Sequence, residues 1–148
     1  MILALNVYDI DKSNVIIGNR EINLVSDYTF FYKLFYSTGY YIMNGIHIKL
    51  NFVDYNSKVY YNYIKINYNI EKNSRLINTI NDIENCILSN ISNVSPSLKN
   101  NVYTELMQSA IKIQKRNVSN NQKHIILKIT GLWENNNSCG LCYKFLLI

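Results

Sequence analysis

The sequence predicts an α+β protein: an antiparallel β-meander with two helices inserted before a C-terminal β-hairpin. Two observations predict this class. Alternating β-branched and aromatic residues dominate the first half of the chain. A helical period replaces that alternation after Glu71, and the alternation returns at His124. The length of 148 residues fits one ordinary core, so we expect residues 1–148 to form a single domain.

The first half of the chain reads as a series of strands separated by polar or glycine-containing turns. Asn44-Gly45 is a typical sequence for a two-residue type I′ turn, which requires positive φ at both central positions, and it predicts a hairpin at this point. The predicted strands are Ile2–Tyr8, Val15–Ile17, Ile22–Val25, Tyr28–Tyr36, Tyr40–Met43, Ile46–Val53 and Lys58–Ile70.

Two helices follow these strands. Apolar residues from Leu76 to Ile91 recur on one helical face, with Ser74 as the expected N-terminal cap. Ser95-Pro96 predicts the start of a second helix, because proline is favoured in a first turn, and its apolar pattern continues to Ile113. Two closing strands, His124–Leu132 and Leu141–Ile148, flank a polar turn.

The strands Ile46–Val53 and Lys58–Ile70 are expected to pair as a hairpin around the loop Tyr55-Asn56-Ser57. Even-numbered residues from Ile46 to Phe52 and from Ile64 to Ile70 are apolar or aromatic and should face the core. That loop length would set Ile48 opposite Ile64 and, on the outer face, Lys49 opposite Tyr63. The Asn44-Gly45 turn would add Tyr40 beside Lys49. The predicted outer face therefore contains Tyr40, His47, Lys49, Asn51, Tyr61, Tyr63 and Lys65.

Exposed aromatic rings between cations are typical of surfaces that bind single-stranded nucleic acid. Bases stack on the rings, and lysines neutralise the phosphates. The alternative is that a helix covers this face, in which case the tyrosines belong to the core and only their hydroxyls reach solvent. The alternating pattern shows which residues share a face and cannot choose between these structures.

Charge and composition bear on the same question. The net charge is +5, which favours an anionic partner. However, the 24 Asn, 22 Ile and 13 Tyr residues are encoded by A- and T-rich codons, so mutational bias explains part of the tyrosine content. Position therefore carries more information than abundance.

The cysteines and acidic residues give no clear catalytic or metal site. Cys139 and Cys142 form a C-x-x-C pattern, but it lies in a predicted hairpin with no following helix to activate a thiol. The remaining candidate ligands, Cys86, His47 and His124, are scattered along the chain. We expect no enzymatic activity, no cofactor and no metal.

The C-terminal segment resembles a known family. Leu127-Lys128-Ile129-Thr130-Gly131-Leu132-Trp133-Glu134, followed by Gly140-Leu141-Cys142-Tyr143-Lys144-Phe145, is similar to the closing hairpin of small single-stranded-DNA-binding proteins of large DNA viruses. The resemblance covers about a seventh of the chain. It implies an OB-like partial barrel and a role supporting replication or recombination, although two consecutive helices depart from a plain OB barrel.

These observations predict a non-enzymatic protein that binds nucleic acid and prefers single strands. Bases would stack on the tyrosines of the outer face, and Trp133 is either a further stacking residue or the anchor of a core corner. The alternative is a structural or protein-interaction component, such as a virion protein or host-factor binder, that pairs through a strand edge, including with copies of itself. No membrane span or secretion signal is evident, so we expect an intracellular protein, in the cytoplasm or nucleus of an infected host cell if it is viral. The predicted nucleic-acid-binding residues are Tyr40, His47, Lys49, Tyr61, Tyr63, Lys65, Lys128, Trp133 and Lys144.

Overall fold

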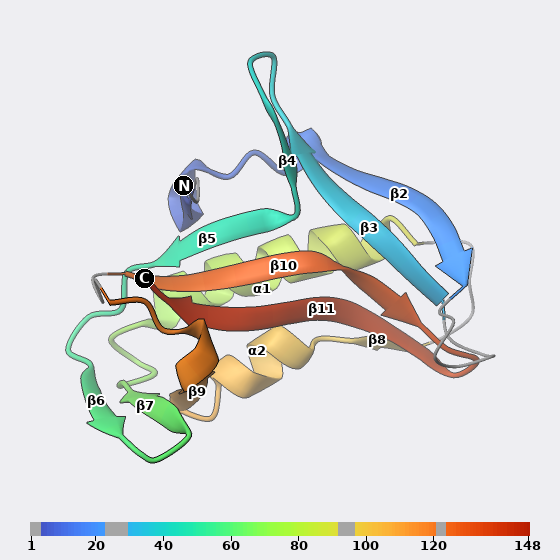
Figure 1. The fold of residues 1–148 in the computed structure, drawn as a ribbon. Coiled ribbons are helices and arrows are strands. Elements are labelled where there is room, and N and C mark those ends of the chain that lie inside the picture. The colour runs from blue at the N-terminus through green and yellow to red at the C-terminus, as the bar shows by residue number, and fades with distance from the viewer. Residues whose placement is uncertain (1–3, 23–29, 92–96, 121–123) are drawn as a thin grey trace.

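Two β-sheets and two α-helices form the part of the chain that the computed structural model describes, which is residues 4–22, 30–91, 97–120 and 124–148 (Figure 1). This confirms the predicted α+β class. The large sheet has eight strands: β1 (Leu5–Asn6), β2 (Val15–Ile22), β3 (Phe30–Ser37), β4 (Ile42–Asn44), β5 (Ile46–Leu50), β8 (Ser97–Lys99), β10 (Ile125–Glu134) and β11 (Ser138–Leu147). The small sheet has three: β6 (Asn56–Val59), β7 (Tyr63–Asn67) and β9 (Ala110–Gln114).

The large sheet is open. Its main path runs β1-β5-β10-β11-β8, and β3 pairs with β10, β2 and β4. Most pairs are antiparallel, but β1–β5 and β11–β8 are parallel, and the successive strands β5 and β6 lie in different sheets. The predicted antiparallel meander is therefore wrong. Among the described strands the sheet does not close on itself, so the OB-like partial barrel implied by the resemblance is not confirmed.

Strand β10 pairs with two different strands along one of its edges. Its first half, Ile125–Ile129, pairs with β5, and its second half, from Gly131 onward, pairs with β3, with an irregularity between the two. Strands β3 and β4 leave β10 at this irregularity as a projecting hairpin, which we call the arm (Figure 1). Because β3 turns away from β10 into the arm, the first half of the same β10 edge is free to pair with β5.

The Asn44-Gly45 turn differs from the prediction. Gly45 has a φ of +75°, but β4 pairs with β3 and β5 pairs with β10, so these residues do not close a hairpin. The chain changes partner strand here, and a Cβ at Gly45 would lie 2.6 Å from the carbonyl oxygen of Ile129. The glycine is needed for this close approach and for its positive φ, whereas the hairpin turn lies at Thr38–Tyr41.

The predicted hairpin of Ile46–Val53 with Lys58–Ile70 is wrong. Strand β5 belongs to the large sheet, and β7 belongs to the small sheet, where it lies between β6 and β9. The predicted facing was nevertheless right, since Ile46, Ile48 and Ile64 are buried while His47 is only half-buried. Alternation determines which residues share a face, but it does not select the partner strand.

The first helix is confirmed as α1 (Ser74–Ser89), with its apolar face buried. Ser74 is its first helical residue and not its cap. Asn73 occupies the capping position, but its side chain bonds to both backbone groups of Val53 and to the carbonyl of Asn69 instead of to the helix.

The second helix is much shorter than predicted. It is α2 (Asn101–Leu106), preceded by β8 and followed by β9, so Ile111 and Ile113 lie in a strand. The predicted start at Ser95-Pro96 lies outside the described residues. The buried Glu84 carboxylate of α1 accepts hydrogen bonds from the Val102 and Tyr103 amides, each at 3.0 Å, and so caps this short helix.

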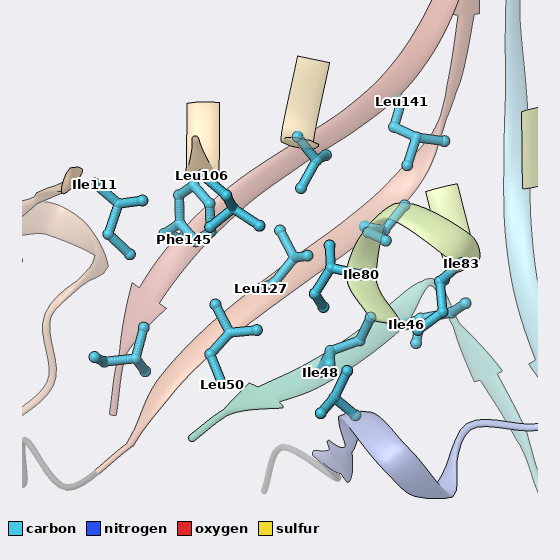
Figure 2. Packing of buried hydrophobic residues seen from close by; sticks show 14 of the residues in the cluster. Ile46, Ile48, Leu50, Ile80, Ile83, Leu106, Ile111, Leu127, Leu141 and Phe145 are labelled. Carbon is cyan, nitrogen blue, oxygen red and sulfur yellow. The ribbon is translucent and has the colours of Figure 1, made fainter. Parts of the chain in front are cut away.

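The C-terminal hairpin is confirmed, since β10 and β11 pair antiparallel along their length. One face of the large sheet packs on α1, and Figure 2 shows side chains of β5, β10 and β11, including Ile48, Leu127 and Leu141, gathered with Ile80 and Ile83 of the helix. Of the other predicted strands, Val15–Ile17 and the described parts of Ile2–Tyr8 and Tyr28–Tyr36 contain strand. Residues 23–25 of Ile22–Val25 lie outside the described residues.

The helices also bear on membrane association. Both α1 and α2 are too short, or too polar, to traverse a lipid bilayer, and no other helix of the described residues meets that requirement.

Candidate functional site

The structure divides the predicted binding residues among three places. Tyr61, Tyr63 and Lys65 lie on the small sheet. Tyr40 is at the tip of the arm, so it does not lie beside Lys49 as predicted. The others lie on the large sheet: His47, Lys49, Lys128, Trp133 and Lys144.

The small sheet carries a row of three lysines on its outer side. Pairing in β6, β7 and β9 places Lys58 opposite Lys65 and Lys65 opposite Lys112. Buried isoleucines alternate with these residues along β7 and β9, so the lysines face away from the core. We call Lys58, Lys65 and Lys112 the lysine row, and together with Tyr60, Tyr61 and Tyr63 they form the small-sheet surface.

Two of these tyrosines stack on each other beside the lysine row. The ring centroids of Tyr60 and Tyr63 lie 4.7 Å apart with an interplanar angle of 16°. The Nζ atom of Lys58 lies 5.3 Å from the Tyr60 centroid, and that of Lys112 lies 5.1 Å from the Tyr63 centroid. Because each ring already covers one face of the other, the lysines approach the two outer faces.

Tyr61 differs from this stacked pair. Its side chain is 91% exposed in the connection between β6 and β7. Tyr61 is therefore the tyrosine of this surface with a ring free for a ligand, whereas the stacked pair positions the two lysines. The sequence prediction gave Tyr61 and Tyr63 the same role, which their different surroundings do not support.

The lysine row has an electrostatic cost. Like charges placed directly opposite each other on adjacent strands are destabilising, by roughly 0.2 to 1 kcal/mol per pair. Within the described ranges, none of the three lysines forms an ion pair. Glu105 lines a hollow with Lys65 and Lys112 and offsets part of their charge, while its carboxylate accepts a hydrogen bond of 2.6 Å from the Tyr143 hydroxyl. The row is thus a concentration of positive charge suited to an anionic ligand.

A second basic row crosses the large sheet. Pairing in β5, β10 and β11 sets His47 opposite Lys128 and Lys128 opposite Lys144. We call these three residues the histidine row. Burial lowers the pKa of His47, and the charges of Lys128 and Lys144 lower it further. The row therefore has two permanent charges and an imidazole that is neutral at pH 7.

The histidine row lies on the side of the sheet opposite α1. Ile46 and Ile48, the strand neighbours of His47, point toward that helix (Figure 2). In Figure 1 α1 lies behind β10 and β11. Helix α2 contacts the inner side as well, where the Tyr143 hydroxyl reaches the Asn101 carbonyl at 3.3 Å. The alternative that one of these helices covers the outward residues of β5 is therefore not what is observed.

The remaining large-sheet residues have different surroundings. Lys49 is half-buried and is opposite Asn6 and Ile126. The Trp133 indole packs on Gly140, where an added Cβ would lie 2.8 Å from the ring, so this tryptophan stabilises the hairpin. Beyond Lys128 is an open hollow of about 370 Å³, lined by Phe31, Lys33, Leu34, Phe35, Asn44, Gly45, Lys128 and Thr130.

The C-x-x-C pattern does not bring its two thiols together. Three residues along a strand reverse the direction of the side chain, so Cys139 and Cys142 point to opposite faces of β11. Burial raises the pKa of both thiols, which disfavours the reactive thiolate. In the described ranges, no cluster of three or more His, Cys, Asp or Glu residues is arranged to hold a metal ion.

Sequence reasoning missed three components of these surfaces, namely Lys58, Tyr60 and Lys112. Lys112 was placed in the second helix, although the alternation Ile111-Lys112-Ile113-Gln114 was a strand signal. Lys58 and Tyr60 lay in a predicted strand, but their relation to Lys112 depends on pairing between distant segments.

Comparisons with known proteins assign the chain to no family. No family model, no curated protein and no solved structure matches the chain.

Proposed function

We propose that this protein binds single-stranded nucleic acid through the small-sheet surface and does so without catalysis. The observation that carries this proposal is the lysine row, in which three cations lie in register without an ion-pair partner in the described ranges. A ligand with regularly spaced phosphates would remove the mutual repulsion of the lysines. The exposed ring of Tyr61 supplies a stacking surface that any base can use.

The proposal favours a single strand over a duplex. Stacking on Tyr61 needs a base with a free face, which paired and stacked bases of a duplex do not offer. The surface is also small, since the lysine row crosses three strands and spans about 10 Å. A flexible strand can place successive phosphates along such a row.

The first experiment removes the charges of the row. Binding of a fluorescent oligothymidylate to the triple variant Lys58→Gln, Lys65→Gln and Lys112→Gln is measured by anisotropy over a series of salt concentrations. Each phosphate contact on a single strand contributes about 0.7 to the slope of log K against log salt, so we expect the slope to fall by about 2. The matched control, Lys12→Gln, Lys72→Gln and Lys99→Gln, makes the same change in net charge at other places and should keep the slope. Equal effects of the two triples would refute the proposal.

A second experiment tests the stacking residue. Replacing Tyr61 by Ala should weaken binding by about 1 to 3 kcal/mol, the usual contribution of one stacked base. Tyr40 is 97% exposed on the arm and gives a matched control, since Tyr40→Ala removes an equally accessible ring from another place. A loss of affinity in the Tyr40 variant, with none in the Tyr61 variant, would contradict the role assigned to the small sheet.

A second candidate function, protein interaction, rests on the arm. Its tip exposes Tyr40 and also Ile42, which is 72% exposed, and residues 38–43 carry no charge. An apolar projection beside the edge strand β4 is suited to pairing with another protein or a second copy. Self-association that is insensitive to salt in sedimentation experiments, and that Tyr40→Ser with Ile42→Ser abolishes, would support this function. A monomer at all concentrations that fails to capture any protein partner would argue against it.

A further inference from the structure

The lysine row and the histidine row end at the same hollow. A hollow of about 420 Å³ lies between β9 and β11, and it is lined by Lys112 of the first row and Lys144 of the second. Arg116, in the short helical turn after β9, adds a third cation to the same lining. The residues at the hollow are Glu105, Lys112, Gln114, Arg116, Asn117, Tyr143, Lys144 and Phe145.

The charges around the hollow are mainly positive. Its one carboxylate, Glu105, accepts the hydrogen bond of the Tyr143 hydroxyl. Within the part of the chain that the structure describes, Lys112, Lys144 and Arg116 form no ion pair. The lining thus holds three cations and the single negative charge of Glu105, so positive charge remains in excess from one sheet to the other.

We propose that a single strand of nucleic acid bound at the small-sheet surface continues over this hollow and along the histidine row. The inference rests on the proposed function and extends its site. The order of contact is β6, β7 and β9, then the hollow, then β11, β10 and β5. Tyr143 in the lining lies on the side of α2, whereas Lys144 faces the opposite side of β11, so the strand would pass around the edge of β11 between the two rows. Each row spans about 10 Å and can contact successive phosphates of a flexible strand.

His47 provides a local report of occupation. The charged groups near it are Lys128 on the neighbouring β10, Lys144 on β11 beyond it and Lys49 on its own strand. The β1 residues Leu5 and Asn6 carry no charge. A phosphate placed on this row would offset the lysines and raise the pKa of His47. Because the chain has only two histidines, their ring proton signals can be followed separately by NMR, with His124 as the second signal.

The test compares oligonucleotides of two lengths. Oligothymidylates of about 4 and about 16 nucleotides cover the range of site sizes known for small β-folds. The variant Lys128→Gln with Lys144→Gln should bind the short strand as the unmodified protein does. For the long strand we expect an affinity loss of about tenfold at low salt and a salt slope smaller by about 1. The control variant Lys12→Gln with Lys99→Gln, which makes the same change in charge, should bind both strands normally.

The outcomes separate the two proposals. If the short strand binds and depends on the lysine row, but the long strand gains nothing from Lys128 and Lys144, the continuous path is wrong and the proposed function stands. If the long strand leaves the pKa of His47 unchanged in the unmodified protein, the path is likewise wrong, and this measurement needs no variant to fold. If neither oligonucleotide binds, the proposed function itself is refuted.

Discussion

The two basic rows have the same arrangement in different settings. Each has three side chains in register across three strands. The lysine row crosses the whole three-stranded small sheet, including its exposed edge strand β6, whereas the histidine row crosses the middle of the large sheet. The lysine row is associated with stacked tyrosines, and the histidine row contains a half-buried imidazole. The histidine row therefore gains positive charge when His47 binds a proton at lower pH, whereas the lysine row contains no histidine.

The largest expected effect concerns the stability of β10, the strand that carries Lys128 of the histidine row. Gly131 lies where β3 approaches β10, and a Cβ there would collide with the Tyr32 carbonyl and the Phe31 ring. Gly131→Ala should lower the free energy of unfolding by at least about 2 kcal/mol, as overpacking does. The measurement is chemical denaturation, and Gly39→Ala is the control because no atom lies within 4 Å of its added Cβ. Equal stability of the two variants would show that the close approach at Gly131 is not needed.

An intermediate effect concerns the cost of the lysine row. Replacing Lys58, Lys65 and Lys112 together by Gln removes two like-charge pairs, so we expect the protein to gain between about 0.4 and about 2 kcal/mol of stability at low salt. The gain should shrink at high salt because ions screen exposed charges. Thermal unfolding at both salt concentrations measures it. If the variant is instead less stable than the unmodified protein at both salt concentrations, the three lysines stabilise the fold. The lysine row then has no net electrostatic cost.

The smallest effect concerns the histidine row and pH. The pKa of His47 in the folded protein is lowered below its ordinary value, so the unfolded chain binds the proton more readily. This group therefore favours unfolding as the pH falls through the ordinary histidine range near about 6.5. His47→Gln should lose less stability than the unmodified protein between about pH 7 and about pH 5, and both should behave alike at higher pH. Parallel curves across this range would contradict the stated environment of His47.

The sequence predicted the local features of the molecule well. The 3.6-residue period located α1, and the alternation of residues separated the outward His47 and Lys65 from their buried neighbours. The polar turn before Ser138 marked the closing hairpin. These features depend on residues near one another in the chain, which is why the pattern revealed them.

The pairing of distant strands could not be predicted in the same way. Strand β5 pairs with β10, about eighty residues later, and β7 pairs not only with its sequence neighbour β6 but also with the distant β9. The candidate site depended on this choice: Tyr63 and Lys49 were expected to be opposite each other but lie in separate sheets. Both basic rows arise from such distant pairings.

The shared edge of β10 has a consequence for how the chain folds. During synthesis, β3 and β5 are made long before the strand that both of them pair with, and β11 follows later still. The outer strands of the large sheet are therefore made first, and the central hairpin of β10 and β11 joins the sheet last. Contacts between such distant segments slow folding and leave unpaired strand edges exposed in the meantime. The nascent chain is therefore expected to need protection from aggregation until β10 and β11 are complete.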